Sequence, residues 1–164
     1  MRSRPSFYCT KAGIRMKVGT SKVRITPPVG SPLAGYSKRT SVSTGVHDDL
    51  FARILILDAN GSRMGIVTCD LIGIMPGTTA SVRSAAEGLG IPAENVMVCA
   101  YHTHSGPIPD MGYGRMNLWM ADLSSRISLS LPAAISNLRE ADFGHASRET
   151  RGFTINRRHP GDGP

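Results

Sequence analysis

The chain has 164 residues, of which 40% are hydrophobic and 19% charged, and its formal net charge is +7. This length supports one domain with a sizeable core, and the composition excludes a chain that is disordered throughout. No apolar run is long enough to span a membrane, and residues 1–15 lack the apolar block of a secretory signal. The default expectation is a cytoplasmic protein without a transmembrane segment.

The basic residues are concentrated at the two ends of the chain. Four of them precede residue 16 and four follow residue 147, whereas the charges between are sparse and mixed. A protein that binds single-stranded nucleic acid would instead interleave clustered basic residues with aromatic ones. The charge distribution therefore predicts no nucleic-acid partner.

The three cysteines are too few and too dispersed for a disulfide framework or a Cys-x-x-Cys metal site. Cys69 and Cys99 lie in apolar runs, where cysteine usually behaves as a small buried hydrophobic residue. This pattern excludes zinc-ribbon and thioredoxin-type sites.

Two parts are expected along the chain. Residues 1–15 show no periodicity and are predicted to be a leader that can be disordered, and residues 16–164 form the domain. The first strand is predicted from Lys17 to about Ile25. Residues 27–49 are rich in Gly, Pro and Ser and predict a loop, and loops of this length are usually functional or disordered.

A hairpin and a crossover unit follow the loop. Two β-branched, apolar runs at 51–57 and 64–69 flank an Asn-Gly pair, which is the signal for a tight hairpin. Thr78 or Thr79 is expected to cap a helix that stops at Gly90. The next strand, Val96–Ala100, then pairs in parallel, as is usual for a strand-helix-strand unit.

The last elements are a long helix over 117–139 and a strand over 142–148. Pro132 is expected to kink or split this helix, and Trp119 is expected to belong to the core. These elements together predict an α/β fold with a mixed sheet and flanking helices.

A pair of histidines is the strongest local signal for chemistry. His102 and His104 directly follow the predicted strand Val96–Ala100, so both side chains can point into one cavity. Imidazole is the commonest protein ligand for zinc, although histidines at this spacing also occur by chance and then only form loop hydrogen bonds. Asp70 follows the neighbouring strand and is expected at the same edge, either in the site or as a turn residue.

Several strings that include this pair occur in an order typical of one family. The strings are ITPPVG at 25–30, AGY at 34–36, GVHD at 45–48, AR at 52–53, DL at 70–71, AYHTHSGP at 100–107 and INRR at 155–158. With them, the chain closely resembles the N-terminal part of the neutral/alkaline, non-lysosomal ceramidases over residues 17–164.

The resemblance implies a zinc-dependent amidase that cuts the N-acyl bond of a ceramide-like lipid, giving a sphingoid base and a fatty acid. It makes His102 a zinc ligand, places His104 beside the metal with a part in catalysis, and matches Arg157 to an arginine linked to activity. His47 matches a family position to which no role is assigned.

Other parts of the family's site are missing from this sequence. In the family, a further histidine, a glutamate and a tyrosine complete the metal shell, and a Gly-Asp-Val-Ser-type motif supplies a catalytic hydroxyl. None of these strings occurs here, and neither His145 nor His159 stands in a matching context. The resemblance therefore implies a truncated N-terminal portion of the catalytic domain, inactive alone and with apolar sheet surface uncovered.

Two other functions stay open from the sequence. The same scaffold could hydrolyse another small amide or ester, or the chain could be a non-catalytic remnant or basic binding module. Ser105 is a candidate nucleophile, but a hydroxyl that caps the turn is the favoured interpretation. The sequence predicts no oligomeric state.

Overall fold

The computed structural model of the chain describes residues 8–9, 16–109, 114–147 and 158. It divides into two compact units, one of residues 14–141 and one formed by both terminal stretches. In the terminal unit, β1 (Tyr8–Cys9) pairs antiparallel with β7 (Gly144–His145). The strand predicted over 142–148 is therefore reduced to the two residues of β7.

The larger unit is built on a five-stranded open sheet in the order β5-β4-β3-β2-β6. Its strands are β2 (Met16–Arg24), β3 (Phe51–Ala59), β4 (Ser62–Cys69), β5 (Val96–Ala100) and β6 (Arg139–Glu140). Only β4 and β5 pair in parallel, and the other neighbours are antiparallel. The predicted mixed sheet and the predicted parallel crossover are both confirmed.

The hairpin between β3 and β4 forms where the Asn-Gly pair predicts it. Asn60 and Gly61 both have positive φ, 53° and 87°, as a type I′ turn requires. The Asp58 carboxylate accepts a hydrogen bond of 2.9 Å from the Gly61 backbone N–H, which stabilises the turn. The turn fixes the register that pairs Ala59 with Ser62.

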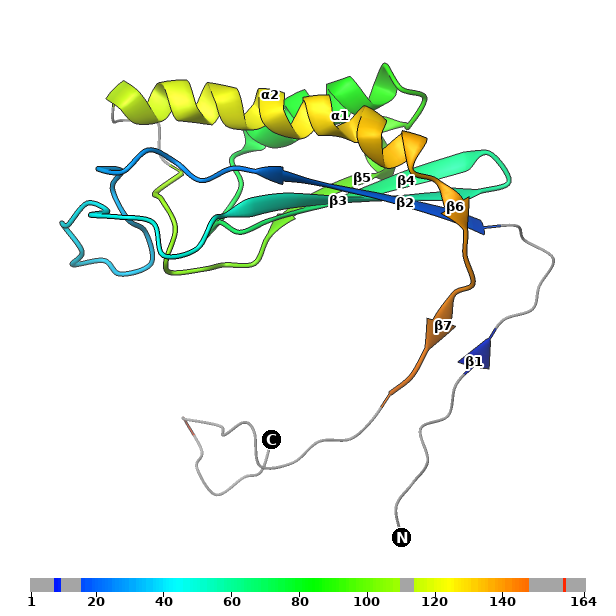
Figure 1. The fold of residues 1–164 in the computed structure, drawn as a ribbon, viewed down its shortest axis with the longest axis horizontal. Coiled ribbons are helices and arrows are strands. Elements are labelled where there is room, and N and C mark those ends of the chain that lie inside the picture. Colours follow the sequence, from blue (N-terminus) through cyan, green and yellow to red (C-terminus); the bar gives the residue numbers. More distant parts are fainter. Residues whose placement is uncertain (1–7, 10–15, 110–113, 148–157, 159–164) are drawn as a thin grey trace, which may run out of the picture. The chain divides into compact units, whose positions relative to one another are not determined.

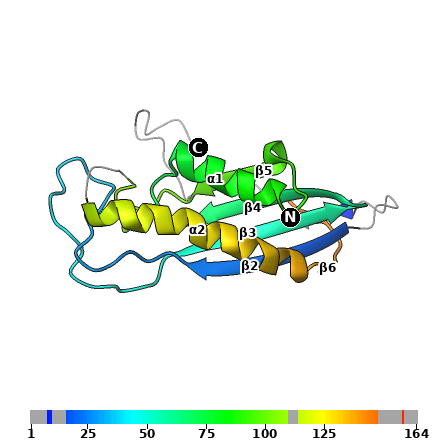
Figure 2. The same cartoon turned by 90° about the horizontal axis from the view of Figure 1, so that it is seen from above.

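Two helices, α1 (Pro76–Glu87) and α2 (Gly114–Ser136), cover one face of the sheet (Figure 1). Seen from above, they lie side by side over the sheet and run roughly along its strands (Figure 2). Alternate residues of the strands point toward the helices and form one core with them, as period-two alternation requires. The largest buried side chains of this core are Ile54, Ile56, Val67, Val82, Leu123, Ile127 and Leu131.

The ends of the helices differ from the sequence-based expectation. Neither Thr78 nor Thr79 caps α1, because the helix begins earlier, at Pro76, and Thr78 is buried inside its first turn. Proline suits a first helical position because its φ is already helical and its missing N–H would be unpaired there. Gly90, with φ 77°, does stop this segment, and its N–H donates to Glu87.

Helix α2 is not split at Pro132 but continues through it as one helix of 23 residues. It ends at Ser136, so Arg139, which was expected to end the helix, instead forms β6 with Glu140. Trp119 and Met120 are buried in the core, as expected for the start of this helix.

Strand β2 and helix α2 approach each other most closely at Gly19. A Cβ atom at this position would lie 2.0 Å from the Ala134 carbonyl oxygen and 3.0 Å from the Leu138 nitrogen. The same contact carries two hydrogen bonds, from Ser21 Oγ to the Ser130 carbonyl (2.8 Å) and from Asn137 Nδ2 to the Thr20 carbonyl (3.1 Å). Only glycine allows the helix backbone to pack this closely on the strand.

We predict that Gly19→Ala lowers the free energy of unfolding by about 3 kcal/mol, because the helix backbone must move away from the strand. Urea denaturation measures this difference. Gly65→Ala in β4 is the matched control, since its Cβ would make ordinary contacts with the side chains of Ile56 at 3.4 Å and Val96 at 3.7 Å and none with backbone. Equal losses in the two variants would contradict the close packing at Gly19.

Candidate functional site

The parallel pairing of β4 and β5 continues past the ends of both strands. The backbone N–H of Tyr101 donates to the Cys69 carbonyl (3.0 Å), and that of Thr103 donates to the Leu71 carbonyl (3.3 Å). The two neighbouring segments therefore stay paired as far as Thr103, which fixes the backbone on both sides of His102.

His102 has an unusual backbone and a defined ring orientation. Its φ is 62°, in the left-handed region that non-glycine residues seldom adopt. Its Nδ1 lies 2.8 Å from the carbonyl oxygen of Ile72. Since a carbonyl oxygen only accepts hydrogen bonds, Nδ1 carries a proton, so that in the neutral ring the lone pair lies on Nε2, the arrangement of a metal-binding histidine.

His104 lies next to His102. The two ring centroids are 5.2 Å apart, with the rings inclined at 68°, and Tyr36 packs edge-on against the other side of His104, also at 5.2 Å. The structure therefore brings together the two histidines that the sequence singled out.

A groove of about 820 Å³ lies beside the pair, between the 101–107 segment and the long loop. Every second residue of the histidine segment lines it, namely Tyr101, Thr103 and Ser105. The imidazoles of His102 and His104 are not part of its wall. Thr103 Oγ1 accepts a hydrogen bond of 3.2 Å from the Ser105 N–H. The hydroxyl that caps this turn is therefore that of Thr103 rather than that of Ser105.

The long loop is attached to the histidine segment by backbone hydrogen bonds. The N–H of Ala34 donates to Gly106 (2.9 Å), the N–H of Ile108 donates to Pro32 (3.0 Å), and Leu33 forms a β-bridge with Pro107. Residues 27–49 therefore form the second wall of the candidate site.

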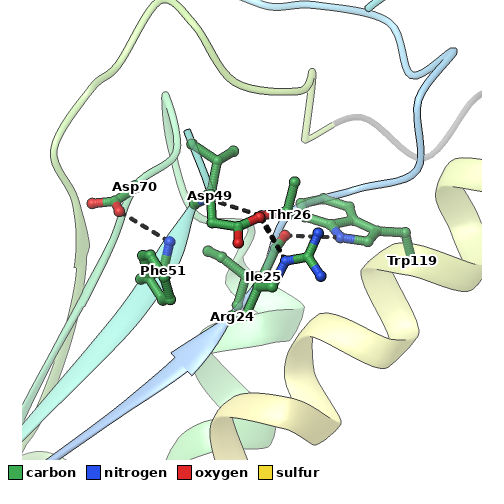
Figure 3. A network of polar contacts seen from close by, with 8 residues as sticks. Arg24, Ile25, Thr26, Asp49, Phe51, Asp70 and Trp119 are labelled. Atoms are coloured by element: carbon green, nitrogen blue, oxygen red, sulfur yellow. Dashed lines mark hydrogen bonds and ion pairs between the residues drawn. The ribbon is translucent and has the colours of Figure 1, made fainter. Parts of the chain in front are cut away.

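The two ends of this loop are tied together by a polar network (Figure 3). Thr26 Oγ1 donates to the Asp49 carboxylate (2.8 Å) and accepts a hydrogen bond from the Leu50 N–H (2.9 Å). Arg24 Nε also donates to Asp49, at 2.6 Å. The Thr26 hydroxyl, with the Arg24 guanidinium, holds the pKa of Asp49 below its usual value.

Asp70 has a structural role at the start of β3. Its carboxylate accepts hydrogen bonds from the Phe51 N–H (2.9 Å, Figure 3) and from Arg53 (2.7 Å). Of the two roles weighed from the sequence, the turn residue is the one these contacts support, although Asp70 also borders the groove. In the same network, Trp119 Nε1 donates to the Ile25 carbonyl at 3.1 Å.

The other histidines do not join the pair. His47 lies in the groove wall with its side chain 98% exposed, and its Nδ1 contacts the Asp48 carboxylate at 2.6 Å. Arg157 and His159 lie outside the described residues, and the side chain of His145 is not described. Across the described ranges, no cluster of three or more His, Cys, Asp or Glu side chains is arranged to hold a metal ion.

Sequence reasoning missed the residues that support His104. Gly35 and Tyr36 belong to a family string but had no assigned role, and Arg39 carried no signal. Arg39 Nη1 donates to the carbonyl oxygens of both Ala34 (2.7 Å) and His104 (2.8 Å). No local pattern could have identified this contact, because it joins residues 65 positions apart.

Residues 16–157 match the family model described as neutral/alkaline non-lysosomal ceramidase, N-terminal. The chain belongs to this family. The resemblance seen in the sequence is therefore confirmed.

The chain is similar to curated and solved ceramidases. It is 32% identical over 107 residues to the neutral ceramidase of Drosophila melanogaster and 29% identical over 155 residues to that of Pseudomonas aeruginosa. These matches cover 62% and 86% of this chain but only 15% and 23% of the relatives. The chain thus matches less than a quarter of either ceramidase.

The fold agrees with the solved structures of this family. The crystal structure of neutral ceramidase from Pseudomonas aeruginosa superposes with a TM-score of 0.64 at 26% identity, over 77% of this chain and 22% of that one. A structure of a ceramidase complexed with C2 gives the same TM-score at 27% identity. Within the part of the chain that the structure describes, neither helix combines the length and apolarity needed to cross a bilayer.

Cys69, at the end of β4 beside the site, is fully buried. Burial, with smaller contributions from Cys99 and Asp70, raises the pKa of its thiol to about 12, from an ordinary value of 9.0. The folded state therefore favours the protonated thiol, which is unreactive toward alkylating reagents.

We predict that this thiol stabilises the fold fully below about pH 9 and that the contribution is lost as the pH rises toward 12. The sign follows because the unfolded chain releases the proton at a lower pH than the folded one. Denaturation curves across this range should show a steeper loss of stability for the wild type than for Cys69→Ala. Parallel losses in both proteins would contradict the assignment.

Proposed function

We propose that this chain forms part of the active site of a zinc-dependent amide hydrolase. The hydrolase cuts the N-acyl bond of a ceramide-like substrate to give a sphingoid base and a fatty acid. The observation that carries the proposal is His102, whose Nδ1 is engaged by the Ile72 carbonyl so that Nε2 is left for a ligand. Membership of the ceramidase family supports the reaction class.

The residues present fit a zinc ion in part. His102 would bind it through Nε2, and the Ile72 carbonyl would fix the tautomer and orientation of the ring, as outer-shell partners of metal-binding histidines do. When bound, zinc would polarise the amide carbonyl and lower the pKa of a bound water. Because catalytic zinc sites use about three protein ligands, we propose that the others come from outside the described residues.

We propose that His104 transfers protons during the reaction. Its ring lies 5.2 Å from that of His102, so it is close to any group that His102 binds. Amide cleavage requires a proton for the leaving amine, and a positioned imidazole is the side chain that most often supplies it. Arg157 is proposed to contribute as well, on the family resemblance alone.

The proposed substrate class comes from the relatives. Those matched by sequence are named neutral ceramidases, and one solved ceramidase is complexed with C2. A panel of N-acyl compounds tests this class against the alternative, another small amide or ester. Cleavage of N-acylsphingosines in preference to simple amides supports it, and the reverse order contradicts it.

The central test replaces His102 by asparagine in the complete natural gene product that contains this chain. Asparagine tolerates a positive φ and can still donate to the Ile72 carbonyl, but it lacks the Nε2 lone pair. We expect loss of bound zinc, measured by atomic absorption, and a fall of more than about 100-fold in hydrolysis of a short-chain ceramide. Glu87→Gln is the control, since Glu87 is exposed at the end of α1 and does not line the groove.

Unchanged zinc content and rate in His102→Asn would end the proposal. We also expect the isolated 164-residue chain to show no hydrolysis of the same substrate, because we propose that further zinc ligands come from elsewhere. Measurable, zinc-dependent turnover by the isolated chain would contradict that part.

A further inference from the structure

The backbone of the 35–39 segment touches His104 directly. Gly35 has a φ of 106°, and a Cβ atom there would lie 2.5 Å from the Cβ of His104 and 2.6 Å from its Cγ. Any side chain at this position would displace the imidazole, so glycine allows the loop to rest against the ring. The loop therefore limits where the His104 ring can lie.

Arg39 connects the two sides of this contact. Its Nη1 donates both to Ala34, in the long loop, and to the carbonyl oxygen of His104. Charge-assisted hydrogen bonds of 2.7 and 2.8 Å are at the strong end for such groups, and the Arg39 side chain is half-buried. Arg39 thus fixes the backbone of His104.

Tyr36 contacts the ring itself. The Arg39 guanidinium lies over the Tyr36 ring at 4.8 Å, and Tyr36 packs perpendicular to His104, which in turn packs against His102. Cation-π and edge-to-face contacts of this kind are both attractive. Three successive contacts therefore run from Arg39 to His102.

We propose that Arg39 and Tyr36 are positioning residues for the imidazole pair, with Gly35 providing the space for their contact. Arg39 holds the His104 backbone, and Tyr36 restricts its ring, so that the two imidazoles keep one mutual orientation. The importance of this orientation for catalysis rests on the function proposed above. When the residues that hold a metal-binding side chain in place are removed, the site binds its metal more weakly.

If the 35–39 segment only stabilised the loop, its side chains would have no need to contact the His104 ring. Backbone hydrogen bonds already join Ala34 to Gly106 and Ile108 to Pro32, so the loop is attached to the histidine segment without Arg39. Tyr36 is largely exposed and contributes little to the core, yet it packs on His104. The 35–39 segment therefore contacts the imidazole of His104 in addition to joining the loop to the histidine segment.

The test uses this chain with isotopically labelled histidine and NMR. In the wild type, nuclear Overhauser contacts are expected between the rings of Tyr36 and His104 and between those of His104 and His102. Arg39→Ala should remove or weaken both, and Arg39→Lys should restore them in part, since an ammonium group can donate to the same carbonyls. Lys38→Ala, which removes a positive charge from an exposed neighbour, should leave both contacts unchanged.

A titration with zinc chloride on the same samples supplies the second measurement. We expect the His102 and His104 signals to respond together in the wild type, with affinity about tenfold weaker in Arg39→Ala and Tyr36→Leu. Amide spectra show whether each variant is folded. Should Arg39→Ala unfold, Tyr36→Leu decides, because it removes the exposed ring and keeps the hydrogen bonds of Arg39.

The outcomes separate the two proposals. Ring contacts between His102 and His104 that persist unchanged in folded Arg39→Ala and Tyr36→Leu would overturn the positioning role. A complete gene product that binds no zinc, with the ring contacts in this chain behaving as expected, would contradict the proposed function while supporting the role of the 35–39 segment in fixing the pair.

Discussion

Parallel pairing between β4 and β5 is the constraint on which the candidate site depends. It brings the ends of both strands to one edge of the sheet, and it extends beyond them through the backbone bonds of Tyr101 and Thr103. These bonds hold the backbone on both sides of His102, and the Ile72 carbonyl lies within hydrogen-bond distance of the His102 ring. A shift of this pairing would separate the Ile72 carbonyl from the ring that it orients.

The long loop completes the site because it is fixed at both ends and in the middle. The Thr26, Asp49 and Arg24 network joins its ends, and backbone bonds to Gly106 join its middle to the histidine segment. These contacts join residues that are distant in sequence, so the loop takes its shape from the sheet edge to which it is bonded rather than from its own composition. A segment rich in Gly, Pro and Ser becomes a defined wall in this way.

The sequence predicts much of this fold, because the relevant signals are local. The Asn60-Gly61 turn, the strands around it and the apolar stripe of α2 follow from short-range patterns, and all are found. The start of α1 was misplaced because Pro76 competes with the threonines as a starting signal. The partners of His104 could not be predicted, since the contact of Arg39 with a carbonyl 65 residues away leaves no trace in a single sequence.

The left-handed backbone of His102 has a consequence for the evolution of this chain. A histidine in this conformation costs on the order of 1 kcal/mol relative to glycine. A redesign that optimised thermal stability alone would therefore replace this residue early. On the function proposed above, the lower stability is the cost of keeping an imidazole at this edge of the sheet.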